Sequence, residues 1–260
     1  MASSGRFRVA ARLDVKGPSL IKGIQMEGLR VIGDPYHYAQ RYHEQGADEL
    51  LYVDTVASLY ERDNIYEILE RTARDVFIPV TVVGGVRSVL DARRLLRSGA
   101  DKVGVNTAAI HRPDLLSELA EEFGRQAVVL SVEAKRNPRS PGSWLAYTNG
   151  GRDNSGREVS EWICEGVETG AGEILLTSVD RDGTRRGLDQ DLINLVGDQI
   201  TVPLLVSGGA SDPLNVARTV TGVAVDGIVV GTALHRDDVT IQGLKAALAG
   251  QGLTTRGDDG

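Results

Sequence analysis

The sequence has little of what marks secreted, membrane or disulfide-bonded proteins. Its 260 residues include a single cysteine, Cys164, so no intrachain disulfide can form, which suits a reducing compartment. No apolar run approaches the roughly 18 residues that a membrane-spanning helix needs. The N-terminal residues MASSGRFRVAARLDV also lack the apolar stretch of a signal peptide. We therefore expect a cytoplasmic protein that does not enter a membrane.

Basic residues are outnumbered by acidic ones, 29 to 36, which gives a formal charge of 29 − 36 = −7. An acidic chain is a poor partner for nucleic acid, so we expect none, although a local site for a small anion remains compatible with this charge. No histidine or cysteine cluster has metal-ligand spacing, and no G-x-G-x-x-G or G-x-x-x-x-G-K-[ST] motif occurs. The sequence therefore predicts neither a metal nor a bound cofactor.

Eight short apolar runs alternate with longer amphipathic segments. The runs are FRVAARLDV, ELLYVDTV, IPVTVVGG, DKVGVN, AVVLSVEA, EILLTSVD, VPLLVSGG and DGIVVGT. Continuous apolar strands joined by single helices are typical of parallel strands covered on both faces. Eight such units predict an α/β fold, a closed (β/α)₈ TIM barrel. We expect residues 1–250 to form one barrel domain and the polar, glycine-rich residues 251–260 to form a flexible tail.

The chain also repeats itself at about half its length. IPVTVVGG and VPLLVSGG are near copies, and their prolines, Pro79 and Pro203, are 203 − 79 = 124 residues apart. The stretches LDVK and VEAK pair Asp14 with Glu133, 119 residues apart. This period is too long for a solenoid and equals half of an eight-unit barrel. The sequence therefore predicts two duplicated half-barrels within one domain.

Two copies of a glycine pair follow predicted strands, Gly84-Gly85 in one half and Gly208-Gly209 in the other. A glycine pair between a strand and a helix start lets backbone N–H groups face an anion. Duplication would place the two sites on opposite sides of the barrel mouth, which suits a substrate with a phosphate at each end. The alternative is that the glycines only permit tight turns.

Asp14 and Glu133 end equivalent strands, where reactive residues of such barrels collect. They would face each other across the mouth, and two acids in different surroundings can serve as general acid and general base. The alternative is that each only pairs with a neighbouring lysine, Asp14 with Lys16 or Lys22 and Glu133 with Lys135.

Several motifs together resemble the cyclase subunit of imidazole glycerol phosphate synthase, from histidine biosynthesis. They are LDVK, GADELLYVD, GADKVGVNTAA, GAGEILLTSVDRDGT and SGGA, and the likeness covers roughly residues 6–250. The resemblance implies a barrel that binds a bis-phosphorylated ribulosyl intermediate, PRFAR. It further implies that ammonia from a partner glutaminase converts PRFAR to imidazole glycerol phosphate and an aminoimidazole carboxamide ribotide (AICAR).

The resemblance also assigns roles to particular residues. Catalysis falls on Asp14, Glu133 and Lys22. The phosphate contacts fall on Gly85, Asn106, Thr107, Asp182, Gly183, Gly208, Gly209 and Thr232. An ammonia gate at the N-terminal end of the barrel, where the glutaminase would dock, falls on Arg8, Glu49, Lys102 and Glu173. For each gate residue alone, the alternative is a surface salt bridge of little consequence.

The sequence departs from the family pattern close to the predicted active site. Glu133 stands where the family has aspartate, and Val86 replaces a third glycine. Arg12 stands two residues before Asp14, where the family usually has a small or uncharged residue, so it shares a strand face with Asp14 and is expected to point into the lumen. These departures leave open a paralogue that uses ammonia to aminate or cyclise a different phosphorylated or sugar substrate. A weak enzyme that mainly activates the glutaminase, and the sister isomerase reaction, are further alternatives.

The stretch RNPRSPGSWLAYTNGGRDNSG follows the fifth predicted strand. Its length and glycines predict a covering element with a short hairpin around residues 144–148. A static surface loop is the alternative.

Overall fold

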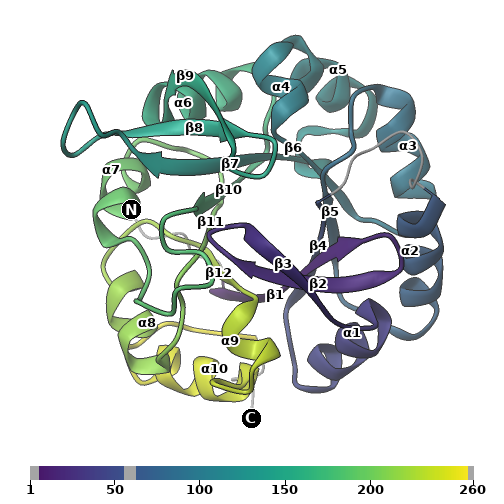
Figure 1. Cartoon of the computed structure of the whole chain (residues 1–260), viewed down its shortest axis with the longest axis vertical. Coiled ribbons are helices and arrows are strands. Elements are labelled where there is room, and N and C mark those ends of the chain that lie inside the picture. Colours follow the sequence, from purple (N-terminus) through teal and green to yellow (C-terminus); the bar gives the residue numbers. More distant parts are fainter. Residues whose placement is uncertain (1–5, 56–62, 257–260) are drawn as a thin grey trace.

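The structure, a computed structural model, describes residues 6–55 and 63–256 of the chain. Eight parallel strands form a closed ring with helices around it, as Figure 1 shows in a view down the barrel. The ring strands are β1 (Arg8–Lys16), β4 (Glu49–Asp54), β5 (Val80–Val83), β6 (Lys102–Val105), β7 (Val128–Arg136), β10 (Glu173–Ser178), β11 (Leu204–Ser207) and β12 (Gly227–Val230). Pairing of β7 with β10 closes the ring. The predicted (β/α)₈ barrel is confirmed, and all eight predicted strands are present; Val56, at the end of one predicted run, lies outside the described residues.

Helices follow the ring strands along the chain and surround the barrel. They are α1 (Pro35–Glu44), α2 (Asp63–Asp75), α3 (Val89–Arg97), α4 (Thr107–His111), α5 (Asp114–Phe123), α6 (Val159–Thr169), α7 (Gln190–Gly197), α8 (Pro213–Val220), α9 (Thr232–His235) and α10 (Ile241–Ala249). Among the described residues, side-chain caps fix the starts of α1, α3, α8 and α10. Ser88 accepts a hydrogen bond from the Asp91 N–H at 3.2 Å, and Asp212 caps α8 in the same manner.

The strands carry two separate apolar layers. Outward residues of β1, such as Val9, Ala11 and Leu13, belong to the large core between the barrel and its helices. A second cluster lies inside the barrel and faces the lumen, with one residue from each of seven ring strands: Ala10, Leu51, Val83, Val129, Leu175, Leu205 and Val229. Alternation along each strand produces both layers, because successive side chains point to opposite faces.

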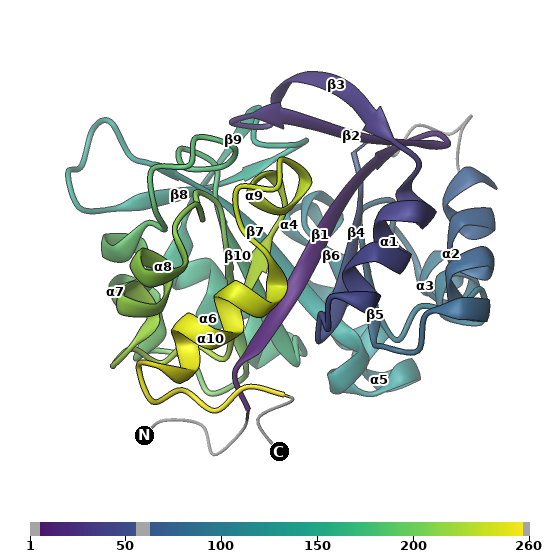
Figure 2. The same ribbon diagram turned by 90° about the horizontal axis from the view of Figure 1, so that it is seen from below.

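A hairpin that the sequence analysis did not predict lies over one end of the barrel. Strands β2 (Ser19–Ile24) and β3 (Glu27–Gly33) follow β1 directly and are antiparallel. Figure 2 shows this hairpin above the end of the barrel opposite to the start of β1. Its turn docks on the loop after β10, where the Gln25 N–H donates to the Asp182 carbonyl at 2.8 Å. The hairpin therefore partly covers the carboxyl ends of the ring strands.

The excursion after β7 contains the expected hairpin, and it is larger than expected. Strand β8 (Trp144–Thr148) pairs with both β7 and β9 (Asp153–Glu158), all antiparallel. The turn between β8 and β9 contains Gly150 and Gly151, both in the left-handed conformation that favours glycine. This turn reaches back over the barrel mouth.

The last described residues return to the opposite end. The Phe7 N–H donates to the Thr254 carbonyl at 2.8 Å, and Thr255 is buried. The division into residues 1–250 and a tail of residues 251–260 stays a prediction. Among the described residues, no helix is both long and apolar enough to cross a membrane.

Candidate active site

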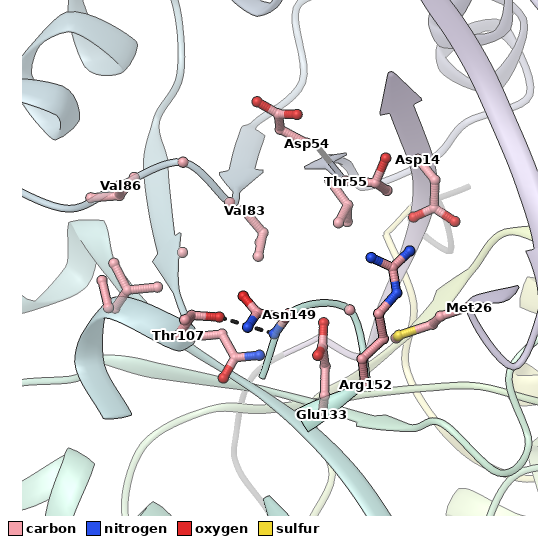
Figure 3. A pocket seen from close by; sticks show the side chains of 18 of the residues that line it. Asp14, Met26, Asp54, Thr55, Val83, Val86, Thr107, Glu133, Asn149 and Arg152 are labelled. Carbon is pink, nitrogen blue, oxygen red and sulfur yellow. Dashed lines mark hydrogen bonds between the residues drawn. The ribbon is translucent and has the colours of Figure 1, made fainter. Parts of the chain in front are cut away.

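A cavity of about 590 Å³ opens at the carboxyl ends of the ring strands, beneath the two hairpins. The predicted site residues that line it are Asp14, Lys22, Gly85, Asn106, Thr107, Glu133 and Asp182. Figure 3 shows Asp14 and Glu133 on different sides of this cavity. The strands thus bring together residues that lie far apart in the sequence.

The Asp14 carboxylate is held by two cations. It accepts a hydrogen bond from Arg12 Nε at 2.7 Å and another from Lys22 Nζ at 2.6 Å. Lys22 Nζ also lies 3.3 Å from both carboxylate oxygens of Asp182. Burial alone would raise the pKa of Asp14, but the charges of Arg12 and Lys22 outweigh burial and hold that pKa well below its usual range. Asp14 therefore rests as a carboxylate and can hold a proton only transiently.

Glu133 has different surroundings. Its Oε2 accepts a hydrogen bond of 2.7 Å from the Gly151 N–H, at the turn between β8 and β9. Burial raises the pKa of Glu133; the Gly151 N–H and the charge of Arg12 oppose this only in part. Glu133 therefore keeps its proton to a higher pH than an exposed glutamate does.

Pairing with a lysine, the alternative to an acid–base role, is found for Asp14 and not for Glu133 among the residues that the structure describes. Asp14 does pair with Lys22, but this lysine comes from β2 and bridges to Asp182 instead of being an isolated neighbour. Lys135 lies over the Tyr147 ring, with Nζ 4.8 Å from its centroid. The hydrogen-bond donor on Glu133 is a backbone amide.

The first glycines of the two pairs have nearly the same geometry. Gly84 has φ 101°, and a Cβ atom placed on it would lie 2.5 Å from the Asp54 carbonyl oxygen. Gly208 has φ 103°, and a Cβ there would lie 2.5 Å from the Ser178 carbonyl oxygen. Both turns require glycine, so the turn interpretation is correct, and the same turns line two pockets at the barrel mouth.

Each pocket contains a buried polar atom without a hydrogen-bond partner in the described part of the chain. In the main cavity this atom is Oδ1 of Asn106, beside Thr107. In a smaller pocket it is Oγ1 of Thr232. That pocket is lined by Asp182, Gly183, Gly208, Gly209, Thr232 and neighbouring residues. Buried polar groups are normally paired, so both atoms suit a polar ligand group.

Arg12 points into the lumen, as the sequence predicts. It is only 5% exposed, and its Nη1 donates to Thr177 Oγ1 on β10 at 3.5 Å. Burial acts to lower the pKa of Arg12, but attraction to Asp14 and Asp182 outweighs burial and raises that pKa. Arg12 therefore remains positively charged, directly below Asp14.

The four predicted gate residues form a closed ring at the N-terminal ends of their strands. Arg8 lies 3.1 Å from a Glu49 oxygen and 2.7 Å from a Glu173 oxygen. Lys102 Nζ lies 2.8 Å from each of the same two glutamates. The glutamates are buried, so this ring differs from an ordinary surface salt bridge.

Some lining residues were missed by the sequence analysis. Arg152, from the turn between β8 and β9, reaches into the cavity in the region between Asp14 and Glu133 in Figure 3. Met26 lines the same cavity from the turn between β2 and β3. No motif flags these residues, because hairpins outside the repeat bring them to the cavity. Among the described residues, no group of three or more His, Cys, Asp or Glu side chains could hold a metal ion.

The closed barrel, with two acids and two glycine turns at the carboxyl ends of its strands, defines a (β/α)₈ enzyme acting on a small substrate. Comparisons with known proteins give the family. The model of the histidine biosynthesis protein family matches residues 8–240, and the chain belongs to this family.

Curated relatives agree over most of the chain. A protein of Legionella pneumophila is 55% identical over 202 residues, which cover 78% of this chain and 94% of the relative. Proteins of Solibacter usitatus (strain Ellin6076) and Myxococcus xanthus (strain DK1622) are each 45% identical over 249 residues, 96% of this chain and 97% of each relative. All three are named imidazole glycerol phosphate synthase subunit HisF.

Proposed function

We propose that the chain is the cyclase subunit of imidazole glycerol phosphate synthase. In this reaction, ammonia and a bis-phosphorylated ribulosyl intermediate give imidazole glycerol phosphate and AICAR. The names of the relatives favour this reaction over a paralogue with another substrate. The observation that carries the proposal is the pair of oppositely tuned acids, Asp14 and Glu133, in one cavity flanked by two glycine turns.

The two phosphates bind at the two glycine turns. One phosphate uses the Gly85 turn with Asn106 and Thr107, where α4 begins. The other uses Asp182, Gly183, Gly208, Gly209 and Thr232. At the second site the Thr232 hydroxyl supplies a donor that no described protein group uses. Binding at both ends holds the central part of the substrate between the two acids.

The two acids then divide the proton transfers. When the ammonia lone pair forms a bond to the ribulosyl carbonyl carbon, the nitrogen becomes positive and loses a proton to Asp14. Glu133, whose pKa is raised by burial, gives one proton to the carbonyl oxygen, and Asp14 passes on the proton that it accepted, so that the oxygen leaves as water and an iminium ion remains. Lys22 bridges Asp14 and Asp182 and keeps the Asp14 carboxylate oriented towards the cavity.

Ammonia comes from a partner glutaminase that docks at the N-terminal face of the barrel. The ring of Arg8, Glu49, Lys102 and Glu173 surrounds the lower end of the lumen on that face. The apolar cluster above the ring suits a small uncharged molecule. Ammonia therefore enters through the ring and passes through the lumen towards Asp14.

The test is turnover of the ribulosyl intermediate by the isolated chain with an ammonium salt. Added ammonia bypasses the glutaminase, so this assay reports the chemistry of the barrel alone. We expect imidazole glycerol phosphate and AICAR in equal amounts. A folded, pure chain that consumes none of the intermediate at saturating ammonia would disprove the proposal.

The partner is tested separately in the complex with the glutaminase of the same source. Lys102→Met removes the cation that joins Glu49 to Glu173 in the ring. We expect the glutamine-driven rate, divided by the ammonium-driven rate, to fall at least about tenfold, because one missing charge-assisted contact on each glutamate disrupts the ring. If the ratio of the two rates is unchanged, ammonia does not enter through the ring.

A further inference from the structure

Strand β1 supplies one side chain to each successive level of the lumen. From the N-terminal end, Arg8 belongs to the ion ring, Ala10 to the apolar cluster, and Asp14 to the catalytic cavity. Arg12 occupies the level between Ala10 and Asp14. Any molecule that moves along the lumen from the ring to the substrate must therefore pass Arg12.

The Arg12 side chain reaches across this level. Its Nε donates to Asp14 on its own strand at 2.7 Å, and its Nη1 reaches Thr177 Oγ1 on β10 at 3.5 Å. Two ring strands, β11 and β12, lie between β1 and β10 on the shorter path around the barrel. The first contact is short and charge-assisted, whereas the second is at the limit of hydrogen-bond distance and weak.

A positive charge at this depth is costly unless it is paired, because burial removes its hydration. The pairing with Asp14 offsets part of this cost. An uncharged residue at this position would avoid the cost altogether, so packing alone does not explain the arginine.

We propose that Arg12 closes the lumen immediately below the acid pair, and that ammonia reaches the substrate only after the guanidinium releases Thr177. Arg12 is then a positioning residue for the second reactant, since it controls when ammonia meets the substrate. Its charge also repels ammonium ions, so the neutral molecule is the species that passes. This inference rests on the proposed function, because it requires ammonia to travel through the lumen.

The hydrogen bonds supply a way for the substrate to open this closure. Arg12 and Lys22 share the Asp14 carboxylate, and Lys22 also contacts Asp182, beside the second glycine turn. A phosphate bound there competes with Asp14 for Lys22. Asp14 then attracts Arg12 more strongly, and the guanidinium moves towards Asp14 and away from its weak contact with Thr177.

The experiment compares two rates for each variant of the complex. The glutamine-driven rate requires ammonia to pass Arg12, whereas the ammonium-driven rate uses ammonia that enters from the open cavity. Damage to Asp14 lowers both rates together, so the ratio of the first rate to the second isolates passage through the lumen. A merely structural role of Arg12 would leave the ratio unchanged.

We expect Arg12→Ala to raise the ratio about tenfold, because both contacts and the side chain itself are lost. Arg12→Met, which keeps much of the bulk, should raise it less. Thr177→Val keeps the Arg12–Asp14 pair and removes only the far contact, so we expect a rise of about two- to fivefold, the equivalent of one weak hydrogen bond. Thermal unfolding of each variant confirms that it is folded.

A control variant shows that the ratio reports on the lumen. Ala10→Val adds bulk one level below Arg12 and should lower the ratio. If the ratio falls in this control but is unchanged or lower in both Arg12→Ala and Thr177→Val, the closure is overturned. A wild-type chain with no ammonium-driven turnover would instead overturn the proposed function, so the two failures are distinguishable.

Discussion

Asp14 and Glu133 stand at matching places in the two half-barrels, yet their carboxyl groups have different partners. Asp14 is bound by two cations, and its pKa is lowered; Glu133 is bound by one backbone amide, and its pKa is raised. The glycine turns show the opposite relation, because Gly84 and Gly208 keep almost identical geometry. The repeat therefore preserves the backbone at these two glycines, while the neighbouring side chains and hairpins determine the surroundings of each acid.

We expect the largest effect from removing the charge of Asp14, the acid that is bound by two cations. Asp14→Asn leaves Arg12 and Lys22 facing a neutral amide. We expect the ammonium-driven kcat to fall about 10⁴-fold, the upper range for loss of an acid–base group. The free energy of unfolding should also fall by about 3–5 kcal/mol, because a buried ion pair loses one partner. A loss of activity below about tenfold would contradict the role of Asp14.

Removing the proton of Glu133 should have the next largest effect. We expect Glu133→Gln to lower kcat about 10³-fold, since the amide cannot give up a proton. In the wild-type chain, the raised pKa of Glu133 means that activity falls only as pH rises through that value, above the usual glutamate range. The measurement is kcat against pH at a constant concentration of free NH₃. If the same decline with rising pH persists in Glu133→Gln, it belongs to another group.

Shortening Glu133 tests why this half-barrel carries glutamate. In Glu133→Asp the carboxyl group retreats by about an ångström from the Gly151 N–H, and we expect about a tenfold loss of kcat. The matched variant Asp14→Glu should lose more, because both cations must move. An increase in imidazole formation by Glu133→Asp would instead indicate that the glutamate is adapted to another substrate.

The two glycine turns test whether the half-barrels share the same backbone geometry. Gly84→Ala and Gly208→Ala each force a Cβ atom against a carbonyl oxygen at positive φ. We expect each to lower the free energy of unfolding by about 2 kcal/mol, measured by urea denaturation. The two losses should be equal within about 1 kcal/mol, since the backbone is repeated. A larger difference would show that the halves have diverged in backbone as well.

The sequence predicts the barrel and the positions of both acids because the repeat marks equivalent strand ends. It does not predict the opposite pKa directions, since the partners of each acid come from elsewhere. Lys22 is on a hairpin that was not predicted, and Gly151 is on a turn whose reach depends on how β8 pairs with β7.

The hairpin of β2 and β3 illustrates the limit of local patterns. Hairpin turns are usually recognised by glycine or asparagine at positions with positive φ. Here Gln25 and Met26 have φ 53° and 62°, so the turn carries no such signal. Docking of Gln25 on Asp182 stabilises the turn, and tertiary contacts of this kind are absent from a sequence window.

One strand, β1, supplies the lumen-facing residues Arg8, Ala10, Arg12 and Asp14. The proposed route of ammonia therefore depends on the register of this strand. A slip of β1 by one residue would turn Val9, Ala11, Leu13 and Val15 into the lumen and move every charged group to the outer face. The outward residues pack in the large core against the helices, on the opposite face of the strand from Asp14. Aliphatic packing on the outside of β1 therefore keeps the ion ring, the lumen arginine and the Asp14 carboxylate aligned along one line.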